Sequence, residues 1–259
     1  MGGYGELFRA GFARQATYRV ALLTGVAANL FFGVFRSAVF LALYRQRGRA
    51  GGLELSDALT YVWVVQTLFG VVFAPWMWEF AERIRSGDVV VDLLRPGDPV
   101  ARTLAVDVGR STFTLLVRGV PQLALAGLVL HLHLPTTPVG LLALCVSLLL
   151  SALAAAELRC LFCSLAFWTP DYRGWWTMLF GALWFGGGFL IPVEFLPRAL
   201  QSLAGFGPLA ALLVMPVRVA TGRAVGSSLA LQLLWVVLGV LACRAMLTVA
   251  ERRLVLHGG

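Results

Sequence analysis

Residues 139–168 read VGLLALCVSLLLSALAAAELRCLFCSLAFW, an apolar stretch in which only Glu157 and Arg159 carry charge. An α-helix needs about 20 mostly apolar residues to cross roughly 30 Å of hydrocarbon, and this stretch is longer than that. Similar runs recur along the chain, each bounded by charged residues, Gly or Pro. The stretch therefore predicts a membrane-spanning helix, and it sets the pattern for the rest of the chain.

The composition of the whole chain favours a polytopic membrane protein. Of its 259 residues, 59% are hydrophobic and 13% are charged, whereas a soluble domain of this length would expose far more charge. We expect an all-α fold that forms a single transmembrane domain over residues 1–259, with six transmembrane helices. The expected spans are residues 20–44, 58–80, 103–130, 139–168, 175–191 and 227–249.

Two further segments are expected to meet the membrane without crossing it. Residues 1–19 alternate apolar and charged positions at near-helical spacing, which predicts an interfacial helix. Residues 192–218 are apolar, but prolines divide them into pieces too short to cross. We expect a broken re-entrant hairpin in the outer leaflet between spans 5 and 6. Its marker residues are Pro192, Glu194, Pro197, Pro208 and Pro216.

The charged residues predict the orientation of the chain in the membrane, and they exclude a P-loop within it. All 21 basic residues are arginine, and a P-loop needs a lysine to reach the nucleotide phosphates. If ATP drives this protein, the ATPase is therefore another polypeptide. The net charge of +8 is scattered between apolar runs, which favours a positive-inside loop bias over a nucleic-acid surface. Six spans place both termini on one side, expected to be cytoplasmic, although the arginine-rich first outer loop departs from the rule.

At this point the motifs resemble a known family. The stretch Ile84-Arg-Ser-Gly-Asp-Val-Val-Val-Asp-Leu-Leu-Arg-Pro96 looks like the Ile-Arg-x-Gly-Asp/Glu…Leu-Leu-x-Pro signature of type-2 ABC transporter permeases. Gly187-Gly-Phe-Leu-Ile-Pro192, Leu196-Pro197, Gly207-Pro208 and Met215-Pro216 follow the family's pattern after span 5, and Gln232 and Trp235 are similar to it in span 6. The resemblance covers nearly the whole chain.

The resemblance implies the membrane subunit of an ABC exporter in the bacterial cytoplasmic membrane, not an enzyme. Two permeases, as a homodimer or a paralogous heterodimer, would sit on a dimer of separate ATPases among membrane lipids. ATP and Mg would bind the partner ATPase, and this chain would bind no cofactor, metal or nucleic acid. Apolar spans suit an amphiphilic or lipid-like substrate. The rival hypotheses are a non-transporting membrane scaffold and an intramembrane enzyme.

The resemblance also implies a cytoplasmic coupling helix within the charged loop 81–102. In this interpretation a short helix presents Ile84, Val89 and Leu93 to a groove of the ATPase; the alternative is a solvated loop with balanced charge. The expected coupling residues are Glu82, Arg83, Ile84, Arg85, Gly87, Asp88 and Val89.

Polar residues inside the spans form the last set of candidates. Asp107, Ser111, Thr114, Arg118 and Gln122 make one stripe on span 3, which either bonds helices together or lines a substrate path. Arg118 and Glu157 lie at similar depths, so a buried ion pair between them is geometrically possible and is favoured; the alternative is that the charges reach the membrane surface separately. Gly25, Asn29 and Gly33 recur every four residues, which indicates close helix packing. The expected intramembrane polar or pathway residues are Asn29, Arg36, Thr114, Arg118, Gln122 and Glu157.

Overall fold

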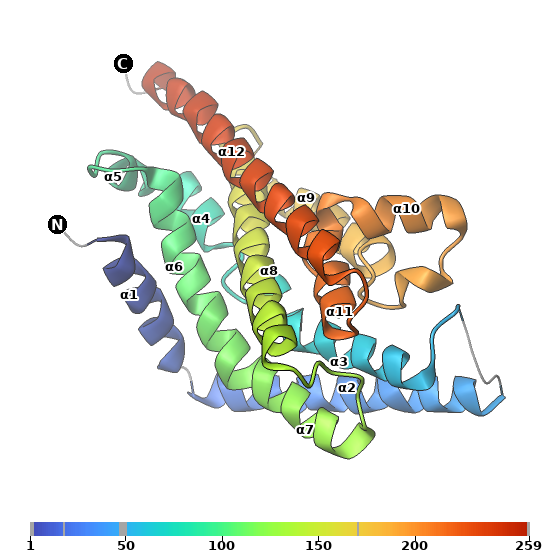
Figure 1. Cartoon of the computed structure of the whole chain (residues 1–259). Helices are drawn as coiled ribbons and strands as arrows, with labels where there is room; N and C mark the ends of the chain where they lie inside the picture. Colours follow the sequence, from blue (N-terminus) through green and yellow to red (C-terminus); the bar gives the residue numbers. More distant parts are fainter. Residues whose placement is uncertain (1–2, 18, 47–50, 170, 258–259) are drawn as a thin grey trace.

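The computed structural model describes residues 3–17, 19–46, 51–169 and 171–257, and within these ranges the chain is helical and contains no strand (Figure 1). The longer helices are α1 (Tyr4–Ala16), α2 (Arg19–Gln46), α3 (Leu55–Val72), α4 (Glu79–Ser86), α6 (Pro99–Thr114), α7 (Val120–Leu130), α8 (Pro138–Ser164), α9 (Tyr172–Gly181), α10 (Arg198–Phe206) and α12 (Val225–His257). The shorter ones are α5 (Val89–Leu93), η1 (Leu115–Gly119), η2 (Leu165–Phe167), η3 (Ala182–Gly186), η4 (Val193–Phe195), η5 (Pro208–Ala211) and α11 (Val214–Ala220).

Among the described residues, five helical segments are long and apolar enough to cross a membrane. They are Leu22–Gln46, Leu55–Val72, Pro99–Leu130, Pro138–Phe167 and Val225–Arg252. The third is continuous through the π-helical turn η1, which joins α6 to α7. These segments coincide with the expected spans 1, 2, 3, 4 and 6, so the prediction of an all-α multi-pass protein is confirmed.

The expected span 175–191 has a different form. The chain is helical there over α9 and η3, from Tyr172 to Gly186, which is about 22 Å at 1.5 Å per residue and too short to cross alone. The segment nevertheless begins beside Arg85, whose guanidinium lies 5.9 Å from the Tyr172 ring centre. The turn that follows it contains Gly188, whose carbonyl accepts a hydrogen bond from Tyr61. Because the helical part is shorter than a full span, the count of six spans stays a prediction.

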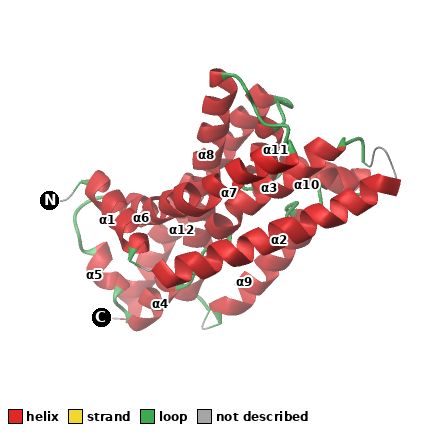
Figure 2. Ribbon diagram, turned by 90° about the horizontal axis from the view of Figure 1, so that it is seen from below, coloured by secondary structure: helices red, strands yellow, loops and turns green. Residues whose placement is uncertain are grey.

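One end of the bundle gathers α1, α4, α5 and both chain termini (Figure 1), and we call it the α4–α5 end. Glu79 in α4 pairs with Arg14 of α1 at 3.3 Å and with Arg110 of α6 at 2.8 Å. Arg244 of α12 pairs with Asp98, just before α6, at 2.7 Å. Seen from below, α2 runs from this end toward α10 (Figure 2).

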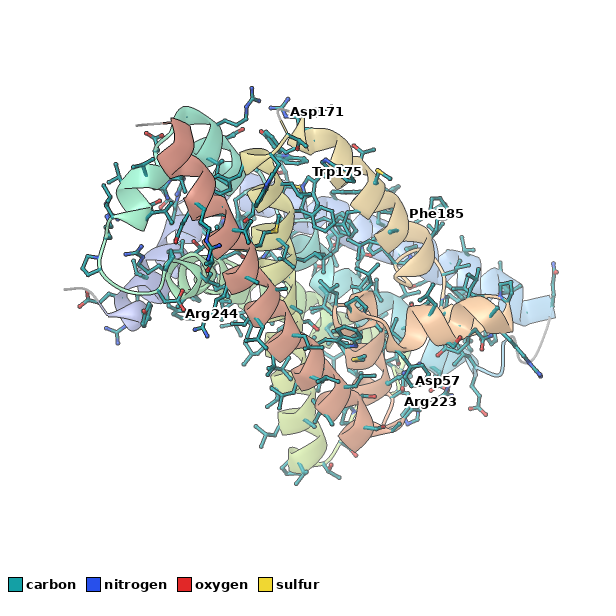
Figure 3. The ribbon with its side chains drawn as sticks, turned by 90° about the horizontal axis from the view of Figure 1, so that it is seen from above. Asp57, Asp171, Trp175, Phe185, Arg223 and Arg244 are labelled. Atoms are coloured by element: carbon teal, nitrogen blue, oxygen red, sulfur yellow. The ribbon has the colours of Figure 1, made fainter. Side chains whose placement is uncertain are left out.

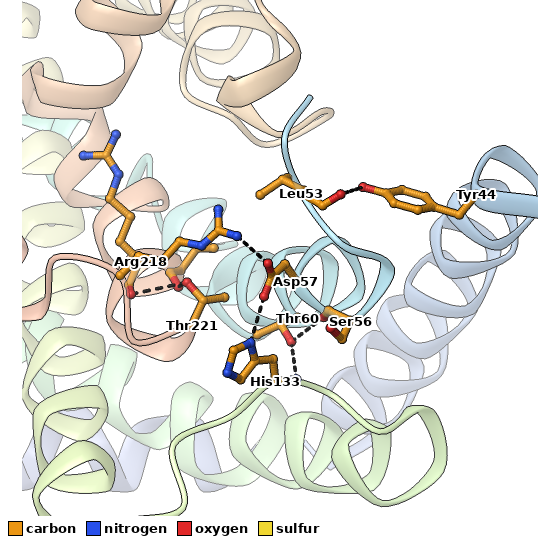
Figure 4. A network of polar contacts seen from close by, with 10 residues as sticks. Tyr44, Leu53, Ser56, Asp57, Thr60, His133, Arg218 and Thr221 are labelled. Atoms are coloured by element: carbon orange, nitrogen blue, oxygen red, sulfur yellow. Dashed lines mark hydrogen bonds and ion pairs between the residues drawn. The ribbon is translucent and has the colours of Figure 1, made fainter. Parts of the chain in front are cut away.

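The opposite end, which we call the Asp57 end, joins three loops. Asp57 at the start of α3 pairs with Arg223 and accepts a hydrogen bond from His133 Nδ1 at 2.9 Å (Figure 4). The backbone N–H of His133 donates to Thr60 at 2.7 Å. Seen from above, Asp57 and Arg223 lie together, away from Asp171 and Arg244 (Figure 3). A chain segment crosses the bundle when it runs from the α4–α5 end to the Asp57 end or back.

Helix α3 is the centre of the core. Its side chains Tyr61, Val62, Val64, Val65 and Leu68 are at most 1% exposed, and α2, α7, α8 and α11 pack around it. The outer faces of α2, α7, α8 and α12 instead expose large apolar side chains, among them Phe31, Leu128, Leu142 and Leu233. An apolar surface of this extent requires lipid or another protein as its surroundings.

Helix α1 lies against α6 with its backbone in close approach. A Cβ atom at Gly11 would come closer than 3.0 Å to the Val106 carbonyl oxygen, and one at Gly109 would come as close to the Phe8 carbonyl oxygen. Phe12 packs edge-on against Phe113, with ring centres 5.1 Å apart. The expected N-terminal helix is therefore present and docked on α6, while its position along a membrane surface stays a prediction.

We predict that Gly11→Ala displaces α1, because backbone atoms cannot yield to the added methyl group. The variant should unfold at a lower temperature and be cut faster by trypsin at Arg9 and Arg14. Gly5→Ala in the same helix is the matched control, since its Cβ would meet nothing within 4 Å, and Ala favours a helix over Gly by about 1 kcal/mol. Equal behaviour of the two variants would contradict the close packing.

Candidate functional site

The charged segment between α3 and α6 folds into two short helices. Glu79 and Glu82 lie in the first turn of α4 and Arg83 and Arg85 in its last, which places each charge where the helix dipole favours it. Gly87 then adopts a φ of 83°, a left-handed conformation that only Gly takes without strain, and α4 ends there. After α5, Asp98 caps α6 by accepting hydrogen bonds from the N–H groups of Val100 and Ala101.

Some apolar side chains of this segment pack against the protein, and others face outward. Ile84 and Val89 are 8% and 1% exposed, so both pack inward, and the expectation that they present an anchor to a partner is wrong. Val91 and Leu94 are 57% and 80% exposed instead, three residues apart and therefore on one side of the α5 turn. The short helices could be predicted from the charge pattern and Gly87; the direction that each side chain faces could not.

The expected charged coupling residues remain at the surface. Glu82, Arg83, Arg85 and Asp88 are exposed, as is Gly87. Arg83 pairs with Asp92 in α5. Nothing in the structure tests whether they contact a partner, so that role stays a prediction.

A cavity of about 660 Å³ lies behind the segment. Side chains of α1, α4, α5, α6, α8 and α12 line it, including Arg83, Asp92, Arg102 and Asp107. Arg102 spans part of its edge by donating to the carbonyls of Arg95 at 2.9 Å and Pro96. The segment is thus tied to the bundle at its edges while space remains between it and the core.

Asp98 joins this segment to α12. Burial opposes ionisation of its carboxyl group, but the hydrogen bonds from Arg244 and from the N–H groups of Ala101 and Val100 outweigh that effect and lower the pKa of Asp98 below its ordinary value. The group is therefore charged at neutral pH, and its ion pair with Arg244 holds α12 beside the start of α6.

One ion pair between the spans joins the buried Arg159 to the partly buried Asp107. Arg159 Nε lies 2.9 Å from Asp107 Oδ2, and a second nitrogen bonds the other carboxylate oxygen. The same guanidinium donates to the Val71 carbonyl at 2.6 Å and to Ser111 at 3.1 Å. A two-pronged pair of this kind fixes both distance and angle, so it locks α3, α6 and α8 together.

The expected pair between Arg118 and Glu157 is wrong, because the two side chains face different helices. Arg118 enters a slot against Gly25 of α2, where an added Cβ would come closer than 3.0 Å to its Nη2. Glu157 points toward α12, where a Cβ at Gly239 would come equally close to its Oε2. Within the described residues Glu157 Oε1 is buried without a hydrogen-bond partner.

A second buried network joins α2, α3 and α7. Asn29 Nδ2 donates to Gln122 Oε1 at 2.5 Å and to the Gln66 carbonyl at 2.9 Å, and Gln66 Nε2 donates to Asn29 Oδ1 at 2.6 Å. Arg36 extends the network through Gln66 Oε1 at 3.2 Å. Thr114 instead bonds the Arg110 carbonyl of its own helix at 3.0 Å. The interpretation of the polar stripe as a bonding seam describes Ser111 and Gln122; a role in transport stays a prediction.

The predicted hairpin consists of the four short helices η4, α10, η5 and α11. Pro192 and Pro197 immediately precede η4 and α10, Pro208 begins η5, and Pro216 lies in the first turn of α11. Proline suits these positions because a helix start leaves its N–H groups unbonded. Glu194 lies in η4, and its Oε2 is buried without a partner in the described part of the chain.

Side chains from the long helices satisfy the backbone where it leaves helical geometry. Tyr61 donates to the Gly188 carbonyl, and Arg36 donates to the carbonyls of Phe189 at 2.6 Å and Leu190 at 3.3 Å. Gly188 has a φ of 78°, and a Cβ there would come closer than 3.0 Å to the Tyr61 hydroxyl. Glycine is therefore required at this turn for both conformation and space.

The far side of the hairpin is held in the same way. Gln232 in α12 donates to the Ala211 carbonyl at 2.8 Å and to Ser151 of α8 at 3.0 Å, while its own oxygen accepts from Ser147 at 2.8 Å. Trp235 donates to the Phe206 carbonyl at 2.8 Å. Of these side chains, Tyr61, Gln66, Ser147 and Ser151 did not stand out in the sequence. A polar residue within an otherwise apolar span is the signal that would have identified them.

We predict that Arg159→Met destabilises the protein by up to about 3 kcal/mol, because it leaves the partly buried Asp107 carboxylate without its counter-ion. Arg244→Met is the matched control: its ion pair with Asp98 is exposed, and such pairs contribute about 0–1 kcal/mol. Thermal unfolding in detergent measures both variants, and Arg159→Met with Asp107→Asn should recover part of the loss. If the two single variants unfold at the same temperature, the buried pair does not hold the bundle.

Comparison with known proteins agrees with this architecture. The family model for ABC-2 family transporter proteins matches residues 31–258. Neither the curated proteins nor the solved structures include a match to the chain. Because the family match covers most of the sequence, this chain belongs to the ABC-2 transporter family, as a membrane component that has no ATPase of its own.

Proposed function

We propose that this chain is the permease subunit of an ABC exporter that moves an amphiphilic or lipid-like substrate across the bacterial cytoplasmic membrane. A dimer of separate ATPase chains supplies the energy, and a second permease completes the path. Membership of the ABC-2 family supports the general assignment to transport. The absence of lysine from the sequence, and hence of a P-loop, supports the division of labour between two kinds of chain.

The surface of the α4–α5 segment, residues 79–94, is the observation that carries this proposal. It combines exposed apolar side chains at Val91 and Leu94 with exposed charges at Arg85 and Asp88. A small apolar anchor surrounded by charge is the composition of a protein-docking surface. We propose that the ATPase binds Val91 and Leu94, while Glu82, Arg83, Arg85 and Asp88 form the rim of the contact.

The contacts behind the segment supply a route for motion. Glu79 in α4 bonds both Arg14 of α1 and Arg110 of α6, so a displacement of α4 pulls on two further helices. The cavity of about 660 Å³ leaves room for that displacement. Closure of the ATPases on ATP would therefore move α4, α1 and α6 as a rigid body.

The two ends of the bundle then face opposite sides of the membrane. We propose that the α4–α5 end and both termini are cytoplasmic, and that residues 172–220 supply the fifth of six spans, as α9 and η3 followed by the broken hairpin. The hairpin would lie in the outer leaflet and form part of the outer gate. Since Asn29, Arg36 and Gln122 are bonded within the chain, we assign them to helix packing and place the substrate path between the two permeases.

We predict that Val91→Asp with Leu94→Asp releases the ATPase while the permease stays folded, because both side chains are exposed and their loss creates no cavity. The pair should weaken ATPase binding about tenfold or more, as the loss of a central anchor does. Arg85→Glu should weaken it less, because it changes only a rim charge. Co-purification with the ATPase and thermal unfolding of the permease measure the two effects.

Substrate-stimulated ATP hydrolysis separates this function from its rivals. A transporter subunit should raise the turnover of its ATPase when substrate is present, whereas a scaffold should bind the ATPase without that response and an intramembrane enzyme should need neither. The docking assignment fails if the Val91→Asp, Leu94→Asp variant still retains its ATPase and its stimulated hydrolysis.

A further inference from the structure

Arg118 is partly buried and differs from the buried arginines Arg36, Arg110 and Arg159. Arg110 and Arg159 each pair with a carboxylate, and Arg36 bonds the carbonyls of a turn. Arg118 lies within the candidate span Pro99–Leu130. Its Nε is buried with no hydrogen-bond partner, and no carboxylate of the described residues forms an ion pair with it. A charge within a span is costly unless something solvates or neutralises it.

The guanidinium occupies a slot shaped for it between α2 and α3. A Cβ at Gly25 would come closer than 3.0 Å to two of its atoms, Nη2 and Cζ, and one at Gly70 would lie 3.6 Å from Cζ. Gly70 is close to the end of α3 at Val72, where the helix dipole supplies a partial negative charge. The nearby carbonyls of Phe69 and Val71 are already bonded, to the Phe73 N–H and to Arg159. The protein therefore neutralises Arg118 only in part.

The position of the slot indicates where the remaining partner comes from. Exposed apolar side chains flank it, with Leu23 on α2 and Leu116 and Val117 on η1, so it borders the lipid-facing surface. Gly25 is six residues from Arg19, the first residue of α2, which is about 9 Å along the helix. Gly70 is two residues from Val72, the last residue of α3, which is about 3 Å along that helix. Both glycines place the guanidinium in the membrane half nearest the α4–α5 end, at the depth of headgroups and upper acyl chains.

We propose that Arg118 binds the phosphate of an anionic phospholipid in this leaflet. A guanidinium can bond two phosphate oxygens at once, and basic pockets between membrane helices bind anionic headgroups on the cytoplasmic side. The acyl chains would lie along Leu23, Leu116 and Val117. The membrane placement rests on the proposed function, but the binding itself requires no ATPase. The phospholipid is either a resident lipid or the transported amphiphile, since both present the same phosphate.

The test compares phosphatidylglycerol with phosphatidylcholine as ligands of the purified full-length chain in detergent. Phosphatidylglycerol should raise the unfolding temperature of the wild type, and Arg118→Gln should weaken its binding about tenfold, as expected when charge-assisted hydrogen bonds are lost. Arg118→Lys should retain part of the binding. Gly25→Ala should also weaken it by displacing the guanidinium, whereas Gly226→Ala should not, because its Cβ would meet nothing within 4 Å.

Two control measurements complete the test. Arg244→Gln removes an exposed arginine at the same end and should leave phosphatidylglycerol binding unchanged. Unfolding of each variant in phosphatidylcholine shows whether the fold is intact. Stimulation of ATP hydrolysis by phosphatidylglycerol in the complex with the ATPase would identify the lipid as cargo, and binding without stimulation would identify it as resident; both outcomes support the site.

Three results would overturn the proposal. Arg118→Gln could leave phosphatidylglycerol binding unchanged, or phosphatidylcholine could bind as well as phosphatidylglycerol. The third is loss of the permease dimer in Arg118→Gln with unaltered lipid binding, which would assign the counter-ion to a second permease. Because lipid binding is measured without the ATPase, failure here is distinguishable from failure of the proposed export function.

Discussion

Part of the backbone inside the bundle is not helical. The structure depends on the side chains that donate hydrogen bonds to the carbonyl groups of this part. Lipid cannot satisfy a free carbonyl, so each break must be satisfied by protein. Tyr61 and Arg36 bond the carbonyls of the turn at residues 188–190, and Gln232 bonds that of Ala211. The donors come from α3, α2 and α12, which are separate in the sequence. The turn at residues 188–190 and the hairpin of η4, α10, η5 and α11 are thereby held by the same helices that form the bundle.

The two ends of the bundle differ in their contacts. At the Asp57 end, Asp57 bonds both His133 and Arg223 and so joins the start of α3 to two loops. At the α4–α5 end, the α4–α5 segment is bonded at its edges over a cavity of about 660 Å³, and Leu94 projects away from the protein. A motion that begins at this segment reaches the core through Glu79 and Arg110. The asymmetry is what a membrane component driven by a separate ATPase requires.

The positions of elements along the chain could be predicted from the sequence, whereas the faces of the helices could not. Apolar length located the five candidate spans, and prolines located the breaks after residue 191. Glu157 and Arg159 are two residues apart and thus point about 200° apart on a helix, so depth alone could not decide which one meets span 3. The π-helical turn η1 further rotates Arg118 relative to Asp107. For the same reason the sequence pattern predicted Ile84 and Val89 on the outer face, where the structure has Val91 and Leu94.

We expect the hairpin that contains α10 and the segment that contains α4 and α5 to lie on opposite sides of the membrane. Single cysteines at Ser202 in α10 and Ser86 in α4, both exposed, test it in a background where the exposed Cys145 is replaced by alanine. An impermeant thiol reagent applied to intact cells should label the Ser202→Cys protein and leave Ser86→Cys unmodified until the membrane is opened. Labelling of Ser86→Cys from outside, or of both positions from the same side, would contradict the account.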